Sequence, residues 1–138
     1  MDASTGLLCK ARQVRSPNFD ARPAGLRPEL IIVHGISLPP GKFGGPWIDR
    51  LFRNELPEDA HPYFAQVAQL KVSTHVLIRR DGKLVQYVSF NDRAWHAGRS
   101  SYLGREGRVG ISGGRPSVVL PLLLLLIGSS NAPRKRYW

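Results

Sequence analysis

Four histidines are the residues of this sequence best suited to metal binding or proton transfer. They stand at positions 34, 61, 75 and 96, and no two have the i, i+4 spacing that places two imidazoles on one helix face. Any metal site must therefore combine distant segments. His34 follows a short apolar run and precedes Gly35, so its imidazole can emerge where a strand ends. That position suits a metal ligand or a catalytic base, and it equally suits a histidine that only hydrogen-bonds at the end of a sheet.

The other three histidines have contexts of their own. His61 precedes Pro62, which predicts a role at the start of a helix. His75 lies inside a predicted strand, so we expect it to pack in the core. His96 follows Trp95 and precedes small residues in a predicted loop, which suits the wall of a substrate cleft.

Aromatic side chains offer a second kind of chemistry, because a flat apolar ring complements the C–H face of a sugar. Trp47, Trp95 and Tyr102 are the candidates. Trp47 lies on a predicted helix and is expected in the core, whereas Trp95 lies in a loop and is the better binding candidate. No Ser-His-Asp arrangement, phosphate-binding glycine loop or paired-carboxylate spacing stands out.

The composition predicts one compact domain without a nucleic-acid partner. The 138 residues are 42% hydrophobic and 22% charged, with a formal net charge of +10. Such a charge favours acidic partners, but the basic residues are scattered and only Arg134–Arg136 form a run of three. A nucleic-acid-binding function therefore rests on charge alone.

The single cysteine and the first residues predict a cytoplasmic location. Cys9 can form no internal disulfide, and it excludes a zinc site built on several thiolates. The apolar stretch Gly6–Cys9 is too short for a signal peptide and no basic residue precedes it. We expect a protein that stays in a reducing compartment.

Apolar spacing and turn residues predict a mixed set of elements. Leu30–Val33 is a continuous apolar run, typical of a strand buried on both faces. Pro46 suits the first turn of a helix over Trp47–Leu56, and Pro62 can open a second helix in which Phe64, Val67 and Ala68 share a face. Val72–Arg79 and Leu84–Phe90 flank Asp81-Gly82 and predict an antiparallel hairpin.

The remaining segments predict little regular structure. Residues 1–29 favour turns, and Asn91–Gly107 resembles a functional loop. Val118–Ile127 contains five consecutive leucines, but ten residues interrupted by Pro121 are too few to span a bilayer, which needs about 20. This run predicts a buried strand or a short helix, or else a tail that is not the natural continuation of the domain.

Several segments together resemble the zinc-dependent N-acetylmuramoyl-L-alanine amidases, and most closely the cytosolic members that act on 1,6-anhydro-muropeptides. The resemblance covers about residues 10 to 108. The matching segments are Ser16–Asp20, Ile32–Pro40, Phe43–Asp49, Ser73–Ile78, Asp81–Gly82 and Arg93–Gly98. It implies an α+β (α/β) fold, with a mixed β-sheet flanked by helices and incomplete at its C-terminus. We expect residues 1–108 to be the N-terminal part of the amidase domain and 109–138 to be an atypical Gly/Leu-rich basic tail.

The resemblance also implies a zinc site of two histidines and one aspartate. His34 matches the first ligand, whereas no histidine follows His96 and no aspartate follows Asp92. The segment that carries the family's catalytic glutamate reads Gly-Ile-Ser here and ends at Ser112, so no catalytic residue is assigned. A frameshift or truncation after about residue 108 would explain these departures together. Gly35 departs as well, since close relatives carry an asparagine there.

The resemblance implies a Zn²⁺ enzyme of cell-wall recycling. It would hydrolyse the amide bond between anhydro-N-acetylmuramic acid and L-alanine in peptidoglycan catabolism, in the cytoplasm and as a monomer. Lys71, Trp95 and Arg105 are the expected contacts to the muropeptide. Three alternatives remain open: an inactive amidase fragment, a muropeptide-binding module without chemistry, and a basic nucleic-acid-binding protein. Zinc content, ligand binding without turnover and salt-dependent DNA binding discriminate among them.

Overall fold

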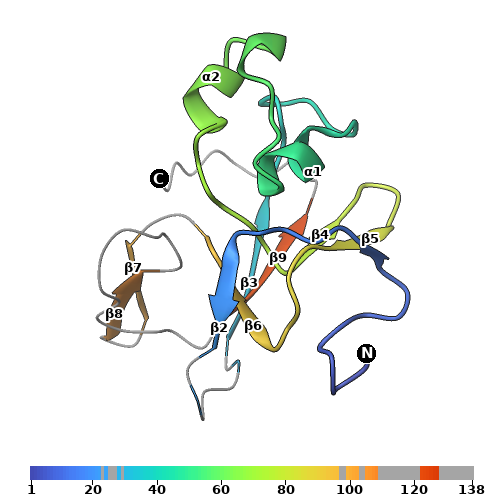
Figure 1. Ribbon diagram of the computed structural model, residues 1–138, viewed down its shortest axis with the longest axis vertical. Coiled ribbons are helices and arrows are strands. Elements are labelled where there is room, and N and C mark those ends of the chain that lie inside the picture. Colours follow the sequence, from blue (N-terminus) through green and yellow to red (C-terminus); the bar gives the residue numbers. More distant parts are fainter. Residues whose placement is uncertain are drawn as a thin grey trace.

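A five-stranded mixed sheet forms the centre of the protein (Figure 1). The computed structural model describes residues 1–22, 24, 28, 30–96, 99–102, 105–108 and 122–127. The strand order is β1 (Arg12–Gln13), β5 (Leu84–Gln86), β4 (Val76–Ile78), β9 (Leu122–Ile127) and β3 (Leu30–Gly35). Only β4 and β5 run antiparallel to each other, and the other neighbours in the sheet are parallel. The predicted mixed sheet is confirmed.

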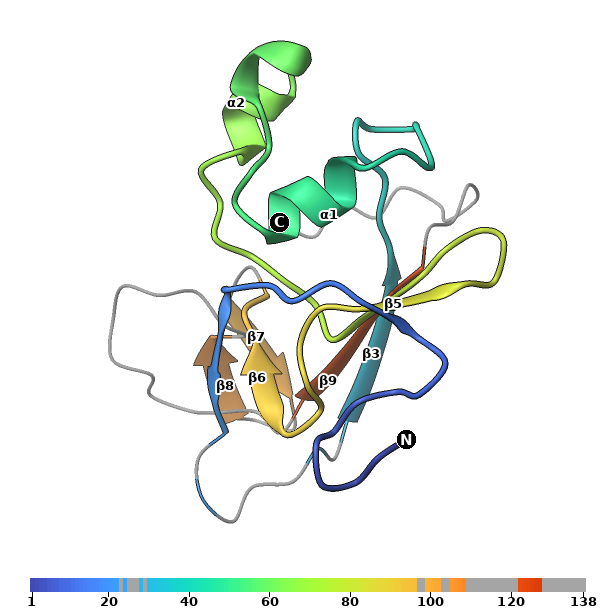
Figure 2. The same cartoon turned by 45° about the vertical axis from the view of Figure 1, so that its right-hand side comes forward.

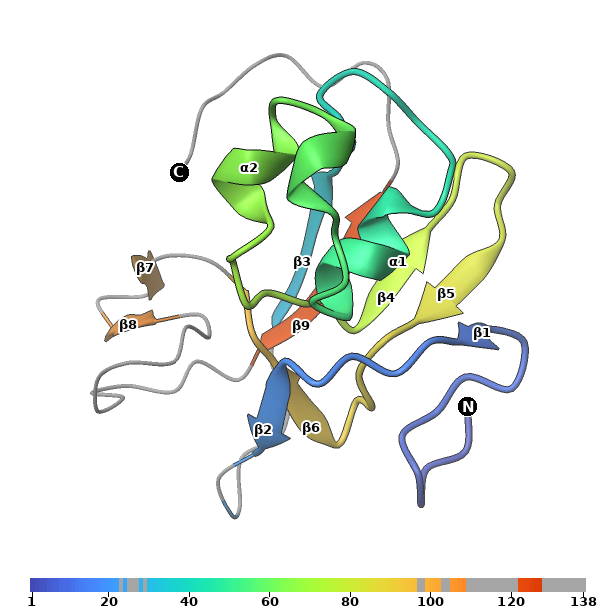
Figure 3. The same ribbon diagram turned by 45° about the horizontal axis from the view of Figure 1, so that its top comes forward.

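Short helices pack over the sheet, as expected, although the first ends at Phe52 and not at the predicted Leu56. Helix α1 (Trp47–Phe52) begins directly after Pro46, η1 (Glu58–Ala60) is one 3₁₀ turn, and α2 (Phe64–Val67) follows Pro62. Figure 3 shows α1 in front of the strands, between the viewer and the sheet. None of the helices in the described ranges has the length and apolar character needed to cross a membrane.

The hydrophobic core lies between α1, α2 and one face of the sheet. Phe64 is fully buried, and Phe52 packs edge-on against Tyr87 of the hairpin with ring centroids 4.9 Å apart. The Tyr87 hydroxyl donates a hydrogen bond to Asp49 of α1, and Asp49 pairs with Arg12 Nη2 at 2.6 Å. Burial, followed by the Asp49 hydrogen bond, raises the pKa of Tyr87. Helix and hairpin are thus joined by apolar packing and by one polar contact.

The predicted hairpin is confirmed, with shorter strands than expected. Val76–Ile78 pairs antiparallel with Leu84–Gln86. The Gly82 N–H donates to the Arg79 carbonyl at 2.9 Å, and Gly82 has a φ of +79°. Only glycine reaches this region of φ without a steric penalty, so Gly82 sets the turn that brings the two strands together.

Strand β3 differs from the prediction, because it is not buried on both faces. Ile31 and Val33 are 58% and 49% exposed, whereas Ile32 between them packs against the core. Among the described strands β3 lies at the end of the sheet and pairs only with β9. An apolar run of this length cannot distinguish a central strand from an edge strand.

Two segments expected to lack regular structure contain strands. In the N-terminal region, β2 (Phe19–Ala21) pairs antiparallel with β6 (Asp92–Ala94). Within the predicted functional loop, β7 (Arg99–Tyr102) pairs antiparallel with β8 (Arg105–Arg108). Figure 2 shows the two pairs as sheets of their own, with β6 near β9. They were missed because these strands are short and largely polar.

The described part of the leucine run, Leu122–Ile127, is a strand and not a short helix. Leu122–Ile127 lies between β4 and β3 and is parallel to both. Residues 109–121 and 128–138 lie outside the described residues, so the predicted boundary after residue 108 stays a prediction.

We expect Gly82→Ala to lower the free energy of unfolding by about 1 kcal/mol, because an alanine side chain is strained at positive φ. A Cβ at this position would meet no atom within 4 Å, so the effect isolates the backbone. Gly82→Asn is the matched control and should cost less, since asparagine tolerates this conformation. Urea denaturation of the three proteins measures the difference, and equal stability of the alanine variant and the wild type would contradict it.

Candidate functional site

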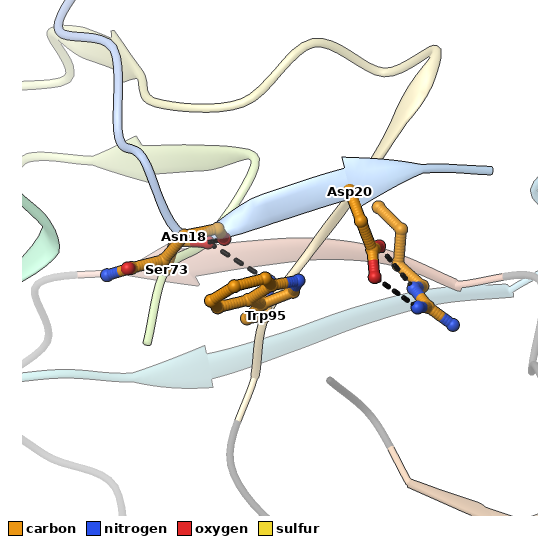
Figure 4. A network of polar contacts seen from close by, with 5 residues as sticks. Asn18, Asp20, Ser73 and Trp95 are labelled. Carbon is orange, nitrogen blue, oxygen red and sulfur yellow. Dashed lines mark hydrogen bonds and ion pairs between the residues drawn. The ribbon is translucent and has the colours of Figure 1, made fainter. Parts of the chain in front are cut away.

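Trp95 follows β6 directly, and hydrogen bonds from other segments hold its backbone N–H and carbonyl. Its N–H donates to the Asn18 carbonyl and to Ser73 Oγ, at 3.1 Å in each case, and its carbonyl accepts the Ser73 N–H at 2.6 Å. Ser73 Oγ in turn donates to the Asn18 carbonyl at 2.6 Å. Figure 4 shows Asn18, Ser73 and Trp95 side by side. Three segments distant in sequence therefore meet at Trp95.

Asn18 ties this site to the C-terminal end of α1. It is 1% exposed, and its side-chain amide donates to the Val72 carbonyl at 2.9 Å and to Asn54 Oδ1 at 2.8 Å. Asn54 Nδ2 donates back to Asn18 Oδ1 at 3.0 Å. Ser16, also buried, donates its hydroxyl to the Phe52 carbonyl. Buried polar groups need such bonds, and here they fix the position of the segment.

An ion pair joins the two strands next to Trp95. Arg93 of β6 donates from Nε to Asp20 Oδ1 at 2.6 Å and from Nη2 to Asp20 Oδ2 (Figure 4). The hydrogen bond that Arg93 donates to Asp20 raises the pKa of Arg93. Because this pair is bidentate, it constrains direction as well as distance, and so it supports the register of β2 with β6.

Two of the three predicted substrate contacts lie close together. Trp95 is half-buried, and Lys71 is exposed two residues before Ser73. Two residues span at most about 7 Å, so the Lys71 backbone lies near the Ser73 and Trp95 backbones that bond to each other. Arg105 lies in β8, but its side chain is outside the described residues, as is that of Tyr102.

His75 is a core histidine, as predicted. It is 2% exposed, and burial lowers its pKa to about 4, against a smaller raising effect of the Asp92 carbonyl and a further lowering by Arg22. Its Nε2 lies 3.2 Å from the Asp92 carbonyl and 3.5 Å from Arg22 Nη2. The imidazole is therefore neutral at neutral pH and braces the segment that leads to Trp95.

His61 and Trp47 have the predicted structural roles, whereas the predicted role of His96 is not tested. His61 Nδ1 accepts the Tyr63 N–H at 3.1 Å just before α2, which confirms its role at the start of the helix. Trp47 is partly buried and packs on Phe64 with ring centroids 5.1 Å apart, so its core role is confirmed. His96 is half-buried beside Trp95, and its place in a cleft wall stays a prediction.

The described residues alone do not form a zinc site. Within these ranges no three His, Cys, Asp or Glu side chains lie close enough to hold one metal ion. The backbone of His34 pairs with Leu126 in the sheet. Its side chain is outside the described residues, so its role as a ligand stays a prediction.

Comparisons with known proteins agree on one family. The family model described as N-acetylmuramoyl-L-alanine amidase matches residues 24–115. A Salmonella typhimurium protein named 1,6-anhydro-N-acetylmuramyl-L-alanine amidase AmpD is 61% identical over 101 residues, which are 73% of this chain and 54% of that protein. The Escherichia coli protein of the same name is 60% identical over 101 residues, 73% of this chain and 55% of its own length. The chain thus spans about half the length of these relatives.

Two solved structures similar to this chain are also AmpD proteins. The crystal structure of a selenomethionine AmpD derivative superposes with a TM-score of 0.79 at 50% identity, covering 92% of this chain and 65% of that one. The solution structure of Citrobacter freundii AmpD gives a TM-score of 0.53 at 50% identity, covering 94% of this chain and 63% of that one. Both structures therefore support the same fold for this chain.

Because His75 is neutral in the folded protein, we expect acid to destabilise it. Above pH 6.5 neither state is protonated at this residue; below it, the unfolded state takes up a proton that the folded state, with a pKa of about 4, does not. The free energy of unfolding should fall by about 2 kcal/mol between pH 6.5 and 5. His75→Gln should flatten this slope and His61→Gln should keep it, as urea denaturation at each pH would show. A wild-type stability that is constant over this range would contradict the assignment.

Proposed function

Since this chain belongs to the N-acetylmuramoyl-L-alanine amidase family, we propose that it acts on muropeptides in peptidoglycan recycling. The bond concerned joins anhydro-N-acetylmuramic acid to the L-alanine of the stem peptide. The observation that carries this proposal is the 61% identity, over 101 residues, to a relative named for that substrate and bond. The lone Cys9 can form no internal disulfide, which suits a reducing compartment, and we propose a cytoplasmic site of action.

The described residues support binding of a ligand that is part sugar and part acidic peptide. The half-buried Trp95 indole offers a flat apolar face to the sugar ring, and the exposed Lys71 ammonium offers a cation to a stem-peptide carboxylate. The formal net charge of +10 favours an anionic ligand in general. We assign Arg105 to a third contact by resemblance to the family.

Zinc is the cofactor that we propose for the family reaction, with His34 as one ligand. The described residues furnish no three-residue cluster to accompany it. The roles that we assign to the described residues are accordingly those of binding and orienting the muropeptide, and no catalytic group is assigned among them.

A second candidate function is a muropeptide-binding module without hydrolysis. The hydrogen-bonded Trp95 segment supports it, because binding of a sugar ring by the indole needs no metal. Both functions require muropeptide binding, so metal content and turnover separate them. An inactive fragment would show neither binding nor turnover.

We expect the 138-residue chain to bind less than one equivalent of zinc and to hydrolyse anhydro-muropeptide at least about 10²-fold more slowly than a full-length relative. One matched ligand, His34, does not complete a catalytic zinc site, which normally has three protein ligands. Ser112 in place of the family glutamate removes a general base, an effect of about 10² to 10⁴-fold. Metal analysis and an amidase assay on the purified chain measure both.

The matched comparison is a chimaera that carries a family-like C-terminal segment after Arg108, which should regain zinc and turnover. If the unmodified chain instead holds stoichiometric zinc and turns over at an ordinary rate, its ligands come from His61, His75, His96 or the tail. The assignment of His34 as the single matched ligand would then be wrong.

Trp95→Ala and Lys71→Ala should weaken muropeptide binding by different amounts. Loss of the aromatic contact, about 1 kcal/mol, should raise Kd about 5-fold, and loss of an exposed ion pair should raise it about 2- to 5-fold. Lys10→Ala is the control, because Lys10 is exposed and lies outside this site. Calorimetry with anhydro-muropeptide and with the anhydro-sugar alone checks the roles: the Lys71 effect should vanish for the sugar and the Trp95 effect should remain. Equal losses from all three variants would count against both assignments.

A further inference from the structure

The hydroxyl of Ser73 lies where it can control Trp95. Ser73 is 2% exposed and precedes β4. Its N–H bonds to the Trp95 carbonyl at 2.6 Å, and its Oγ accepts the Trp95 N–H at 3.1 Å while donating to the Asn18 carbonyl at 2.6 Å. Both backbone polar groups of Trp95 are thus engaged by one residue. The backbone of Trp95 cannot shift without lengthening at least one of these bonds.

We propose that Ser73 is a positioning residue that fixes the orientation of the Trp95 indole for the muropeptide. The backbone sets the direction of the Trp95 Cα–Cβ bond and limits the rotamers open to the indole, and Ser73 bonds to this backbone at both its N–H and its carbonyl. The importance of this orientation for a ligand rests on the function proposed above. Ser73 does not itself touch the ligand in this proposal.

The Ser73 hydroxyl can be removed by mutation without displacing Asn18. Asn18 is held independently by Val72 and Asn54, so its carbonyl stays in place when the Ser73 hydroxyl is removed. Trp95 then keeps one N–H bond to the Asn18 carbonyl and its carbonyl bond to the Ser73 N–H. Removal of the hydroxyl should therefore loosen Trp95 and leave the fold intact.

A Trp95 side chain that is held less firmly should bind the muropeptide less tightly. Displacements of about 1 Å at a binding or reacting position can cost up to about 10²-fold. Because two of the four hydrogen bonds among Asn18, Ser73 and Trp95 remain, we expect a smaller effect, a rise in Kd of about 3- to 10-fold for anhydro-muropeptide.

The test uses the 138-residue chain labelled with 5-fluorotryptophan and compares Ser73→Ala with Ser89→Ala. Ser89 is a matched control: its Oγ donates to the Thr5 carbonyl at 2.7 Å and accepts the Asn91 N–H at 3.0 Å, but it does not contact Trp95. The ¹⁹F resonance of Trp95, assigned from Trp95→Phe, reports its surroundings. The resonance of Trp47, which packs in the core, is the internal reference. Ser73→Cys, close in size but a weak donor, replaces the alanine variant if that variant does not fold.

We expect the Trp95 resonance to shift or broaden in Ser73→Ala while the Trp47 resonance stays, and we expect the Kd to rise 3- to 10-fold. Ser89→Ala should change neither. An unchanged Trp95 resonance, an unchanged Kd in a wild type that binds, or an equal change at Trp47 would overturn the proposal. If the wild type does not bind anhydro-muropeptide at all, the proposed function fails, and the ¹⁹F spectra alone decide whether Ser73 positions Trp95.

Discussion

The buried side chain of Asn18 joins stretches of backbone that lie far apart in the sequence. Its amide group bonds to Asn54 and to the Val72 carbonyl, and its backbone carbonyl accepts bonds from Ser73 and Trp95. A buried amide without such bonds would cost about 1 to 3 kcal/mol, so this residue specifies one arrangement of the segments around it. The helix end, the start of the hairpin and the Trp95 segment all take their relative positions from this contact.

Local chemistry made part of this fold predictable. Asp81-Gly82 predicted the hairpin because a turn depends on a few adjacent residues, and Pro46 with its following apolar spacing predicted α1 in the same way. The pairing of β2 with β6 could not be predicted, since it joins Asp20 to Arg93 across 73 positions and neither strand has an apolar pattern. The register of a strand depends on its partner strand, and the sequence of one strand does not identify that partner.

In the candidate site, too, only features that depend on neighbouring residues were predictable. Loop context pointed to Trp95, but nothing in the sequence pattern marked Asn18 or Ser73 as buried, because polar residues in polar stretches normally lie on the surface. Only their presence in segments that resemble the family pointed to them. His61 and His75 were assigned correctly from their neighbours, since a proline after one and a β-rich segment around the other are local features.

The exposed apolar face of β3 has a consequence for how copies of this protein behave toward one another. Among the described strands β3 has no partner on one side, Ile31 and Val33 are exposed, and unpaired strand edges are templates for pairing between molecules. A formal charge of +10 on each copy opposes such encounters. Added salt shortens the range of that repulsion, to about 10 Å at 0.1 M, while it leaves the apolar attraction in place. We therefore expect copies of this protein to associate more readily as ionic strength rises.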